Sequence, residues 1–282
     1  MLPLYKSNLK TELFQGFRSV LFAAAFVYFG LIAILYMKQR DFIYFPDQNT
    51  PNKASVNAED VVQDIFVTTD DGLKLMGWFI EPSVPSKPVI LFFHGNAGDI
   101  SHRLFKVSQY TNAGYGVLMA EYRGYGGNPS SPTEGGLYKD GRAYFSWLHE
   151  AGYKNQDIIL YGESLGTGVA VQMASEHAVK AVILEAPYSR LSDPARRTYF
   201  FIPFIDMLMH DKYYSIDKIG AIQAPKLFMI AGKDEVLGPQ TGLNLYEAAP
   251  APKVLEIFSE AKHNAIYHYD ASDVVLAFLS GL

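Results

Sequence analysis

The sequence contains no cysteine among its 282 residues. Disulfide bonds, a cysteine nucleophile and thiolate metal sites are therefore excluded, and composition gives no information about the redox compartment. The chain also lacks an excess of positive charge, because its formal net charge is −5 at pH 7. A nucleic-acid-binding protein needs a basic face, so no nucleic-acid partner is predicted. Internal repeats and low-complexity tracts are absent too, and the length suits one large domain with an appendage.

One segment stands apart because it carries no charge, the stretch from Ser19 to Met37. As a helix it would be roughly 28 Å long, close to the ~30 Å of a bilayer's hydrocarbon core. Arg18 bounds one end, and Lys38 and Arg40 follow the other. We interpret the segment as a transmembrane anchor. A cleaved signal peptide, which normally has a shorter apolar region, and a buried core helix are the alternatives.

The anchor divides the chain into four predicted parts. Residues 1–18 form an N-terminal flank, 19–37 the single membrane span, 38–60 a tether and 61–282 the folded domain. Basic residues lie on both sides of the span, and their slight excess on the N-terminal side favours a cytoplasmic N-terminus. The domain would then lie on the non-cytoplasmic side, although the sequence leaves the side open.

From residue 61 onward the sequence alternates between apolar strands and helices. Residues 61–82 predict a β-hairpin, with Asp71-Gly72 as its turn. Further strands are predicted at 87–95, 116–124, 157–164, 179–187, 226–232 and 253–259. Helices are predicted at 99–113, 135–150, 167–178, 240–249 and 264–281. This alternation indicates an α/β domain with a mostly parallel, doubly wound sheet, whose reactive groups gather at the carboxyl ends of the strands.

Ser164 lies between two glycines at the end of a predicted strand, in the sequence LYGESLGTG. This G-x-S-x-G pattern is typical of a nucleophile elbow, a sharp strand-to-helix turn that exposes a serine oxygen. Gly162 and Gly166 leave the space that this turn requires. The backbone N–H of Leu165 would point toward the serine oxygen and stabilise a developing oxyanion. Because the pattern also arises by chance, it needs an acid, a base and a second oxyanion donor elsewhere.

The second oxyanion donor is expected in the loop HGNAG, which follows the strand at 87–95. We favour the backbone N–H of Asn96, with that of Ala97 as the alternative. His94 begins this loop and is a candidate base. A histidine at such a position more often braces the loop through hydrogen bonds.

The acid and the base are expected after the last two strands. Asp234 and Glu235 both follow the strand at 226–232, and we favour Asp234 as the acid, with Glu235 as the runner-up. His263 follows the strand at 253–259 and is the predicted base, whereas His268 lies deeper in the closing helix. The order serine, acid, histidine is the order of the nucleophile-elbow hydrolases.

Several blocks of the sequence resemble the α/β-hydrolase superfamily over residues 61–282. More narrowly, they are similar to the membrane-anchored, single-pass α/β-hydrolase-domain proteins of the bud-emergence type. The similar blocks are FFHGNAGDISHR, EYRGYGG, YGESLGTG and the pair HN after the last strand. The resemblance implies an α/β-hydrolase fold and serine-hydrolase activity with a triad of Ser164, Asp234 and His263. It also implies no cofactor, and we predict no metal site. Substrates in the wider group are acyl esters, thioesters or lipids.

Three positions depart from the family's usual pattern. Glu121 stands where an aspartate is common, and Lys262 stands where a glycine often precedes the histidine. Gly232 precedes Asp234 by two residues, whereas the family usually has a spacing of three. None of these changes removes a reacting group, but the shorter spacing keeps Glu235 open as the acid.

Residues 188–223 interrupt the strand–helix alternation at the place where hydrolases of this fold carry a cap. The stretch TYFFIPFIDMLM within it is rich in apolar side chains. We predict that Phe200, Phe201, Phe204 and Met207 line an acyl pocket. Two alternatives remain: a surface that contacts the bilayer beside the anchor, and the core face of a helix packed on the sheet.

These features together predict a membrane-tethered serine hydrolase. It would cleave carboxylic esters or thioesters of small-molecule or lipid acyl substrates through an acyl-enzyme. The alternatives are a non-catalytic hydrolase-fold scaffold that binds a partner, and a serine peptidase that uses the same triad. A complete triad favours an enzyme over a scaffold.

Overall fold

The computed structural model describes residues 5–54, 58 and 61–282, so parts of the predicted flank and tether lie outside the described residues. An eight-stranded sheet forms the centre of the domain, with the strand order β10-β9-β8-β7-β4-β6-β3-β2. Its strands are β2 (Gln63–Thr68), β3 (Lys74–Ile80), β4 (Val89–Phe93), β6 (Gly116–Ala120), β7 (Ile158–Glu163), β8 (Ala181–Glu185), β9 (Lys226–Ala231) and β10 (Lys253–Phe258).

The sheet is mostly parallel, as the sequence predicts. Every neighbouring pair from β10 to β6 is parallel, whereas β3 is antiparallel to both β6 and β2. The β2–β3 pair is the predicted hairpin, in which Thr68 faces Lys74 across the turn. Gly72 in this turn has a φ of 82°, a conformation that glycine adopts without steric cost.

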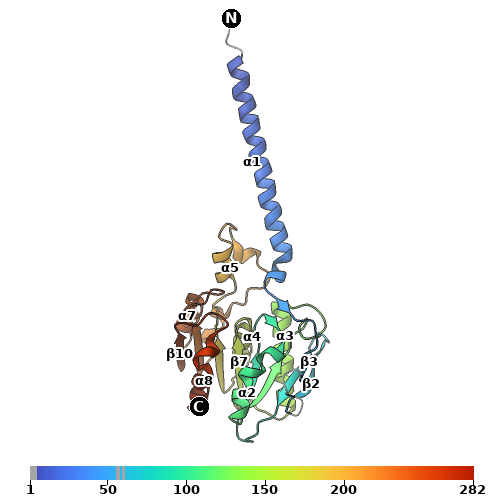
Figure 1. Cartoon of the computed structure of the whole chain (residues 1–282), viewed down its shortest axis with the longest axis vertical. Coiled ribbons are helices and arrows are strands. Elements are labelled where there is room, and N and C mark those ends of the chain that lie inside the picture. The colour runs from blue at the N-terminus through green and yellow to red at the C-terminus, as the bar shows by residue number, and fades with distance from the viewer. Residues whose placement is uncertain (1–4, 55–57, 59–60) are drawn as a thin grey trace.

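Helices cover both faces of the sheet (Figure 1). Apolar side chains fill the space between the layers. The helices α3 (Glu134–Glu150), α4 (Leu165–Glu176) and α7 (Pro239–Ala248) share one core with the sheet, and α2 (Leu104–Asn112) and α8 (Ala271–Ser280) share the other. The central strand β4 supplies Leu91 to the first core and Ile90 and Phe92 to the second. An uninterrupted apolar run is what a strand buried on both faces requires.

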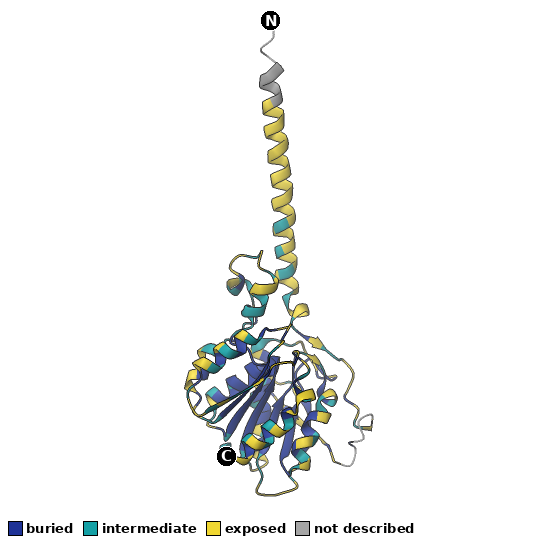
Figure 2. Cartoon of the chain, turned by 60° about the vertical axis from the view of Figure 1, so that its left-hand side comes forward, coloured by how far each residue is buried: buried dark blue, intermediate teal, exposed yellow. Residues whose placement is uncertain are grey.

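The helix α1 (Tyr5–Lys38) extends away from the domain as a long rod (Figure 1). It is longer than the predicted span of residues 19–37, because the polar residues before Ser19 continue the helix. Most of its described surface is exposed (Figure 2). Its apolar part has a mean hydropathy of 2.4 and is long enough to cross a membrane. Its length and composition are those of a membrane span or a signal sequence.

The first part of the predicted tether packs on the domain. The short strand β1 (Phe45–Pro46) pairs in parallel with β5 (Ala97–Gly98). Tyr44 is only 5% exposed, and its hydroxyl lies 2.9 Å from that of Tyr213. The proline and asparagine content of this segment indicates irregular backbone, but irregular backbone can still be attached to a domain.

The cap lies between β8 and β9, beside the end of α1 that is nearest the domain (Figure 1). It contains the short helices α5 (Ser192–Thr198) and α6 (Ile205–Leu208). An ion pair of 2.8 Å between Arg40 and Asp211 joins it to the chain that leaves α1. Single 3-10 turns complete the described elements at Gln39–Phe42, Ile100–Arg103, Asn155–Asp157, Ser215–Asp217, Ile219–Ala221 and Ile266–Tyr269.

Candidate active site

Ser164 occupies the sharp turn between β7 and α4. Its φ of 49° and ψ of −114° are rare for a residue with a Cβ atom. Hydrogen bonds hold this conformation: the Ser164 N–H donates to the carbonyl of Glu185 at 2.8 Å, and the Thr167 N–H and hydroxyl donate to the Ser164 carbonyl. Strained backbone persists only where its surroundings fix it in this way. The turn therefore presents the serine oxygen at the carboxyl edge of the sheet.

The two glycines around Ser164 are required by close packing. A Cβ atom on Gly166 would lie 2.1 Å from the carbonyl oxygen of Phe93. A Cβ atom on Gly162 would lie 2.5 Å from the Cα atom of Thr167. Real Cβ contacts do not approach this closely, and backbone atoms cannot swing aside as a flexible side chain can. The motif predicted from the sequence therefore has a steric basis in the fold.

The structure brings Ser164, His263 and Asp234 together, although they lie on three separate loops. Nε2 of His263 is 2.8 Å from Oγ of Ser164, and Nδ1 of His263 is 2.7 Å from Oδ2 of Asp234. All three residues are buried. With a proton on Nδ1 shared toward Asp234, Nε2 is free to accept the serine proton. This geometry suits a nucleophile, a base and an orienting acid, and the catalytic roles stay predictions.

The two candidate acids have different partners. The carboxylate of Asp234 contacts the His263 ring, whereas Oε2 of Glu235 accepts the backbone N–H of His263 at 3.2 Å. Oδ1 of Asp234 also accepts the N–H groups of Val236 and Leu237 at 2.9 and 2.8 Å. The geometry therefore favours Asp234 for orienting the imidazole.

The surroundings of Asp234 favour its ionised form. Burial opposes ionisation of the Asp234 carboxyl. The hydrogen bond from His263, the positive charge of that ring when it is protonated and the two backbone N–H groups outweigh burial, so the pKa of Asp234 is lowered. A carboxylate with a lowered pKa stabilises the fold at pH values above the unfolded pKa. That contribution is lost as the pH falls through the lower, folded value.

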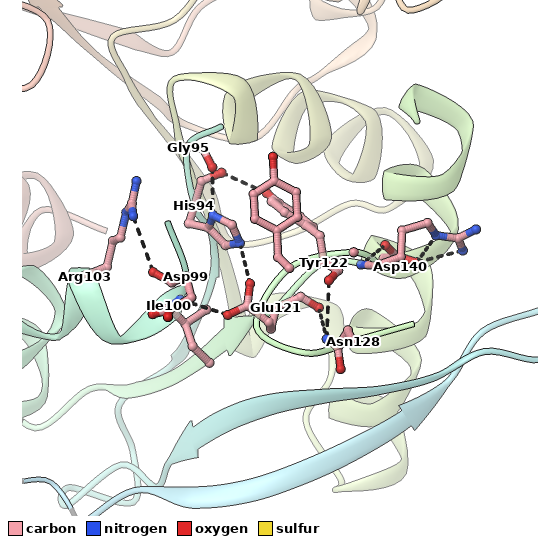
Figure 3. Close-up of polar contacts among 12 residues, drawn as sticks. His94, Gly95, Asp99, Ile100, Arg103, Glu121, Tyr122, Asn128 and Asp140 are labelled. Carbon is pink, nitrogen blue, oxygen red and sulfur yellow. Dashed lines mark hydrogen bonds and ion pairs between the residues drawn. The ribbon is translucent and has the colours of Figure 1, made fainter. Parts of the chain in front are cut away.

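His94 braces the loop after β4 through both of its ring nitrogens. Its Nδ1 is 2.7 Å from the carbonyl oxygen of Gly95, and its Nε2 is 3.0 Å from Oε1 of Glu121 (Figure 3). The other carboxylate oxygen of Glu121 accepts the N–H of Ile100 at 2.9 Å. Both ring nitrogens are thus occupied, which agrees with the bracing role. Glu121, at the position where aspartate is common in the family, reaches both ends of the loop.

Three hydrogen-bond partners fix Asn96 in place. Its carbonyl oxygen accepts the N–H of Phe45 and the hydroxyl of Tyr125, both at 2.8 Å, and its side chain donates to the carbonyl of Ile43 at 2.8 Å. Its own N–H makes no hydrogen bond to any residue that the structure describes. The N–H of Leu165 belongs to the first turn of α4, where N–H groups have no intrahelical acceptor. These are the two N–H groups predicted to hold an oxyanion.

Comparison with known proteins places this chain in a family. The family described as the alpha/beta hydrolase fold matches residues 88–209. The human alpha/beta hydrolase domain-containing protein 17B is 30% identical over 223 residues, which cover 76% of this chain and 74% of that protein. The chain belongs to the alpha/beta hydrolase family.

Two further proteins are similar to this chain. An uncharacterized protein of Mycobacterium tuberculosis is 36% identical over 245 residues, covering 85% of each chain. The solved structure of an esterase from Pyrococcus furiosus shares the fold, with a TM-score of 0.67 at 20% identity, and the match covers 84% of this chain and 97% of the esterase. The predicted α/β-hydrolase fold is therefore confirmed.

An apolar cavity of about 270 Å³ adjoins Ser164 in this hydrolase. Asn96, Ser164 and Leu165 are among its lining residues. Side chains from the cap and from the end of α1 nearest the domain form most of its walls. These walls include Ile32, Leu35, Tyr36, Tyr188, Leu191, Tyr199, Ile202, Ile205 and Leu208.

The prediction that Phe200, Phe201, Phe204 and Met207 line the acyl pocket is wrong. None of the four lines the cavity, and all four are exposed. Their neighbours Tyr199, Ile202 and Ile205 line it instead. The cap is built from turns and very short helices, so no regular period tells which side chains face inward. The cap does line the cavity, but through different residues.

A second hollow also adjoins Ser164, with the basic residues His102, Arg103 and Lys106 among its lining residues. Arg103 and Lys106 each donate to Glu163 at 3.0 Å, and Lys106 also contacts Glu185 at 2.7 Å. Burial opposes ionisation of Glu163, but the charges of Lys106 and Arg103 outweigh it and lower the pKa of this carboxyl. The residue before Ser164 is thereby held ionised and fixed to α2.

The sequence analysis missed this charged cluster and the contribution of α1 to the cavity. Arg103 and Lys106 are three residues apart and so lie on one face of a helix, which was the available signal. The stretch of α1 that lines the cavity is uniformly apolar, so its composition gave no signal.

The close approach at Gly166 gives a test of the elbow. We expect Gly166→Ala to lower the free energy of unfolding by about 3 kcal/mol or more, because the new methyl group overlaps the Phe93 carbonyl. Gly135→Ala in α3 is the control, since no atom lies within 4 Å of its added Cβ. Urea unfolding of the full chain in detergent micelles measures both. Equal stability of the two variants would contradict the steric argument.

Proposed function

We propose that this hydrolase is a membrane-tethered serine hydrolase that cleaves carboxylic esters or thioesters. The observation that carries the proposal is the continuous hydrogen-bonded chain from Ser164 through His263 to Asp234, next to an apolar cavity. A hydroxyl needs such a base to become a nucleophile near neutral pH. The family supports hydrolysis in general, and the choice of ester or thioester rests on this geometry.

The reaction proceeds in two acyl-transfer steps. Nε2 of His263 takes the proton of the Ser164 hydroxyl while Oγ attacks the substrate carbonyl carbon. The N–H groups of Asn96 and Leu165 stabilise the oxyanion, and His263 then protonates the leaving alcohol or thiol. Water attacks the acyl-enzyme with His263 again as base, which releases the acid and restores Ser164. Asp234 keeps the imidazole in the required tautomer and stabilises its protonated form.

Membrane tethering is the part of the proposal that α1 supports. Its apolar window has a mean hydropathy of 2.4, and none of its residues is fully buried. An uncharged surface of that length has a favourable environment in a bilayer. Lys38 and Arg40 follow the uncharged stretch at the end nearest the domain, where basic side chains reach the membrane surface.

The first test is covalent labelling of the serine. We expect the full chain in detergent to react with a fluorophosphonate probe at Ser164 and to hydrolyse p-nitrophenyl butyrate. Ser164→Ala is expected to lose labelling and to lower kcat by at least about 10³-fold. Labelling followed by peptide mass spectrometry identifies the modified residue. A wild-type chain without labelling, or turnover unchanged in Ser164→Ala, would refute the proposal.

The second test separates the two candidate acids. We expect Asp234→Asn to lower kcat by roughly 10³- to 10⁴-fold, because an amide cannot hold His263 in the required tautomer. Glu235→Gln is the matched control and should change kcat little, since the Glu235 carboxylate meets His263 at its backbone N–H. Steady-state ester hydrolysis measures both variants. A larger loss in Glu235→Gln would assign the acid to Glu235.

A further inference from the structure

One face of α1 differs from the rest of the helix because it packs on the cap. Tyr28, Ile32, Leu35 and the following Gln39 are partly buried, whereas all other residues between Lys10 and Lys38 are exposed. The intervals of four, three and four residues place these side chains on one side of a helix. The stripe is confined to the half of the helix nearest the domain, as Figure 2 also shows.

Hydrogen bonds fix both ends of this stripe to the cap. The hydroxyl of Tyr28 donates to the carbonyl oxygen of Phe201 at 2.8 Å. The side chain of Gln39 donates to the carbonyl oxygen of Leu208 at 3.2 Å and accepts the N–H of His210 at 2.6 Å. The cap therefore lies alongside about three turns of α1.

The middle of the stripe forms part of the cavity wall. Ile32 and Leu35, together with Tyr36, line the same apolar cavity that Ser164 lines. From the cap, Ile202 and Ile205 line it as well. The cavity next to the nucleophile is thus enclosed between the cap and the helix that has the composition of a membrane span.

The position of the stripe sets its depth in a bilayer. The uncharged stretch ends at Met37, and Tyr28 lies nine residues earlier. At 1.5 Å per residue, the contact between Tyr28 and the cap lies ~13 Å inside the end of that stretch. A bilayer that covers Ser19 to Met37 would therefore also surround the outer part of the cap.

The outer part of the cap has an apolar surface suited to that position. The outward cap patch, which we define as Phe200, Phe201, Phe204 and Met207, is exposed, and three of its members are more than three-quarters exposed. An exposed patch of three phenylalanines and a methionine is unfavourable in water, and such patches commonly mark a membrane or partner interface. The patch is continuous with α1 through the Tyr28–Phe201 contact, which favours the bilayer as its partner.

Two arginines of the cap, Arg196 and Arg197, have polar partners. Arg196 pairs with Asp206 and with Asp193. Arg197 donates to the carbonyl oxygen of Val236 at 2.9 Å, which turns it toward the domain. Pairing lowers the cost of placing these groups near the lipid boundary.

We propose that this hydrolase takes its acyl chain directly from the bilayer. The outward cap patch lies in the lipid, and α1 forms the membrane-side wall of the acyl cavity. The inference rests on the proposed function, because it assigns the substrate class of the same serine. The substrate is an amphiphile whose acyl chain enters the apolar cavity, while its polar part faces the hollow that His102, Arg103 and Lys106 line.

The location of the patch is tested without any catalytic readout. The full chain with Phe204→Trp is reconstituted in phosphatidylcholine vesicles. We expect lipids with brominated acyl chains to quench the fluorescence of the added tryptophan. Phe66→Trp on β2 is the control, because Phe66 is also exposed but lies far from the cap (Figure 1). The native Trp78 and Trp147 give the same background in both variants. The proposal would be overturned if the tryptophan at position 204 were quenched no more than the tryptophan at position 66.

The role of α1 in the site is tested by filling the cavity from the helix side. The readout is kcat/KM for p-nitrophenyl palmitate divided by kcat/KM for p-nitrophenyl butyrate. We expect Leu35→Trp to lower this ratio by at least tenfold, because the indole occupies the space that a long acyl chain needs. The control is Ile34→Trp, because Ile34 is adjacent on α1 but exposed and outside the cavity. Reconstituted full chains are assayed in the same vesicles. An unchanged ratio in Leu35→Trp, or an equal fall in both variants, would overturn the role of α1.

The two arms distinguish this inference from the proposed function. If the wild-type chain neither labels at Ser164 nor hydrolyses either ester, the proposed function fails, and the quenching arm still decides where the cap lies. If labelling and butyrate hydrolysis are present but the quenching or the chain-length ratio fails, the proposed function stands and the bilayer route is refuted.

Discussion

The near contact of two backbones at the centre of the sheet controls the rest of the site. α4 begins so close to β4 that a single methyl group at Gly166 would overlap the Phe93 carbonyl. This contact sets the direction of the first turn of α4 and, with it, the N–H of Leu165. It also forces Ser164 into a conformation that most residues avoid. A looser junction would leave the serine free to rotate away from His263. The position of the serine oxygen therefore depends on the close packing of α4 against β4.

The sequence carries the information about the reacting groups because each depends on a local signal. An apolar run followed by a polar residue places that residue at the carboxyl edge of a parallel sheet. Three such runs end near Ser164, Asp234 and His263. Parallel pairing places the carboxyl ends of these three strands at the same edge of the sheet. The alternation predicts parallel pairing, but it does not predict the observed strand order, in which β4 lies between β7 and β6. The fold class and the three central side chains were nevertheless predictable from sequence, and the triad distances agree with that placement.

The remaining features depend on contacts that have no local signature. Within the cap, Phe204 faces outward and Ile205 faces the cavity, and neither a helical nor a strand period separates two adjacent apolar residues. In α1, every position near Leu35 is apolar, so the side that packs is set by the cap and not by composition. The choice between Asp234 and Glu235 likewise required geometry, since both carboxylates follow the same strand and only one faces the imidazole.

The link between α1 and the chemistry extends past the cavity to the oxyanion loop. The segment that leaves α1 supplies the carbonyl of Ile43 to the side chain of Asn96 and the N–H of Phe45 to its carbonyl. These bonds help to fix the peptide whose neighbour would hold the oxyanion. A boundary at residue 61, where the regular alternation begins, would remove them while leaving the eight-stranded sheet complete. The contacts of Asn96 therefore extend the candidate site beyond the main sheet, to the segment that follows α1. In the proposed membrane-tethered enzyme, the segment that joins the anchor to the domain also holds the proposed oxyanion loop in place.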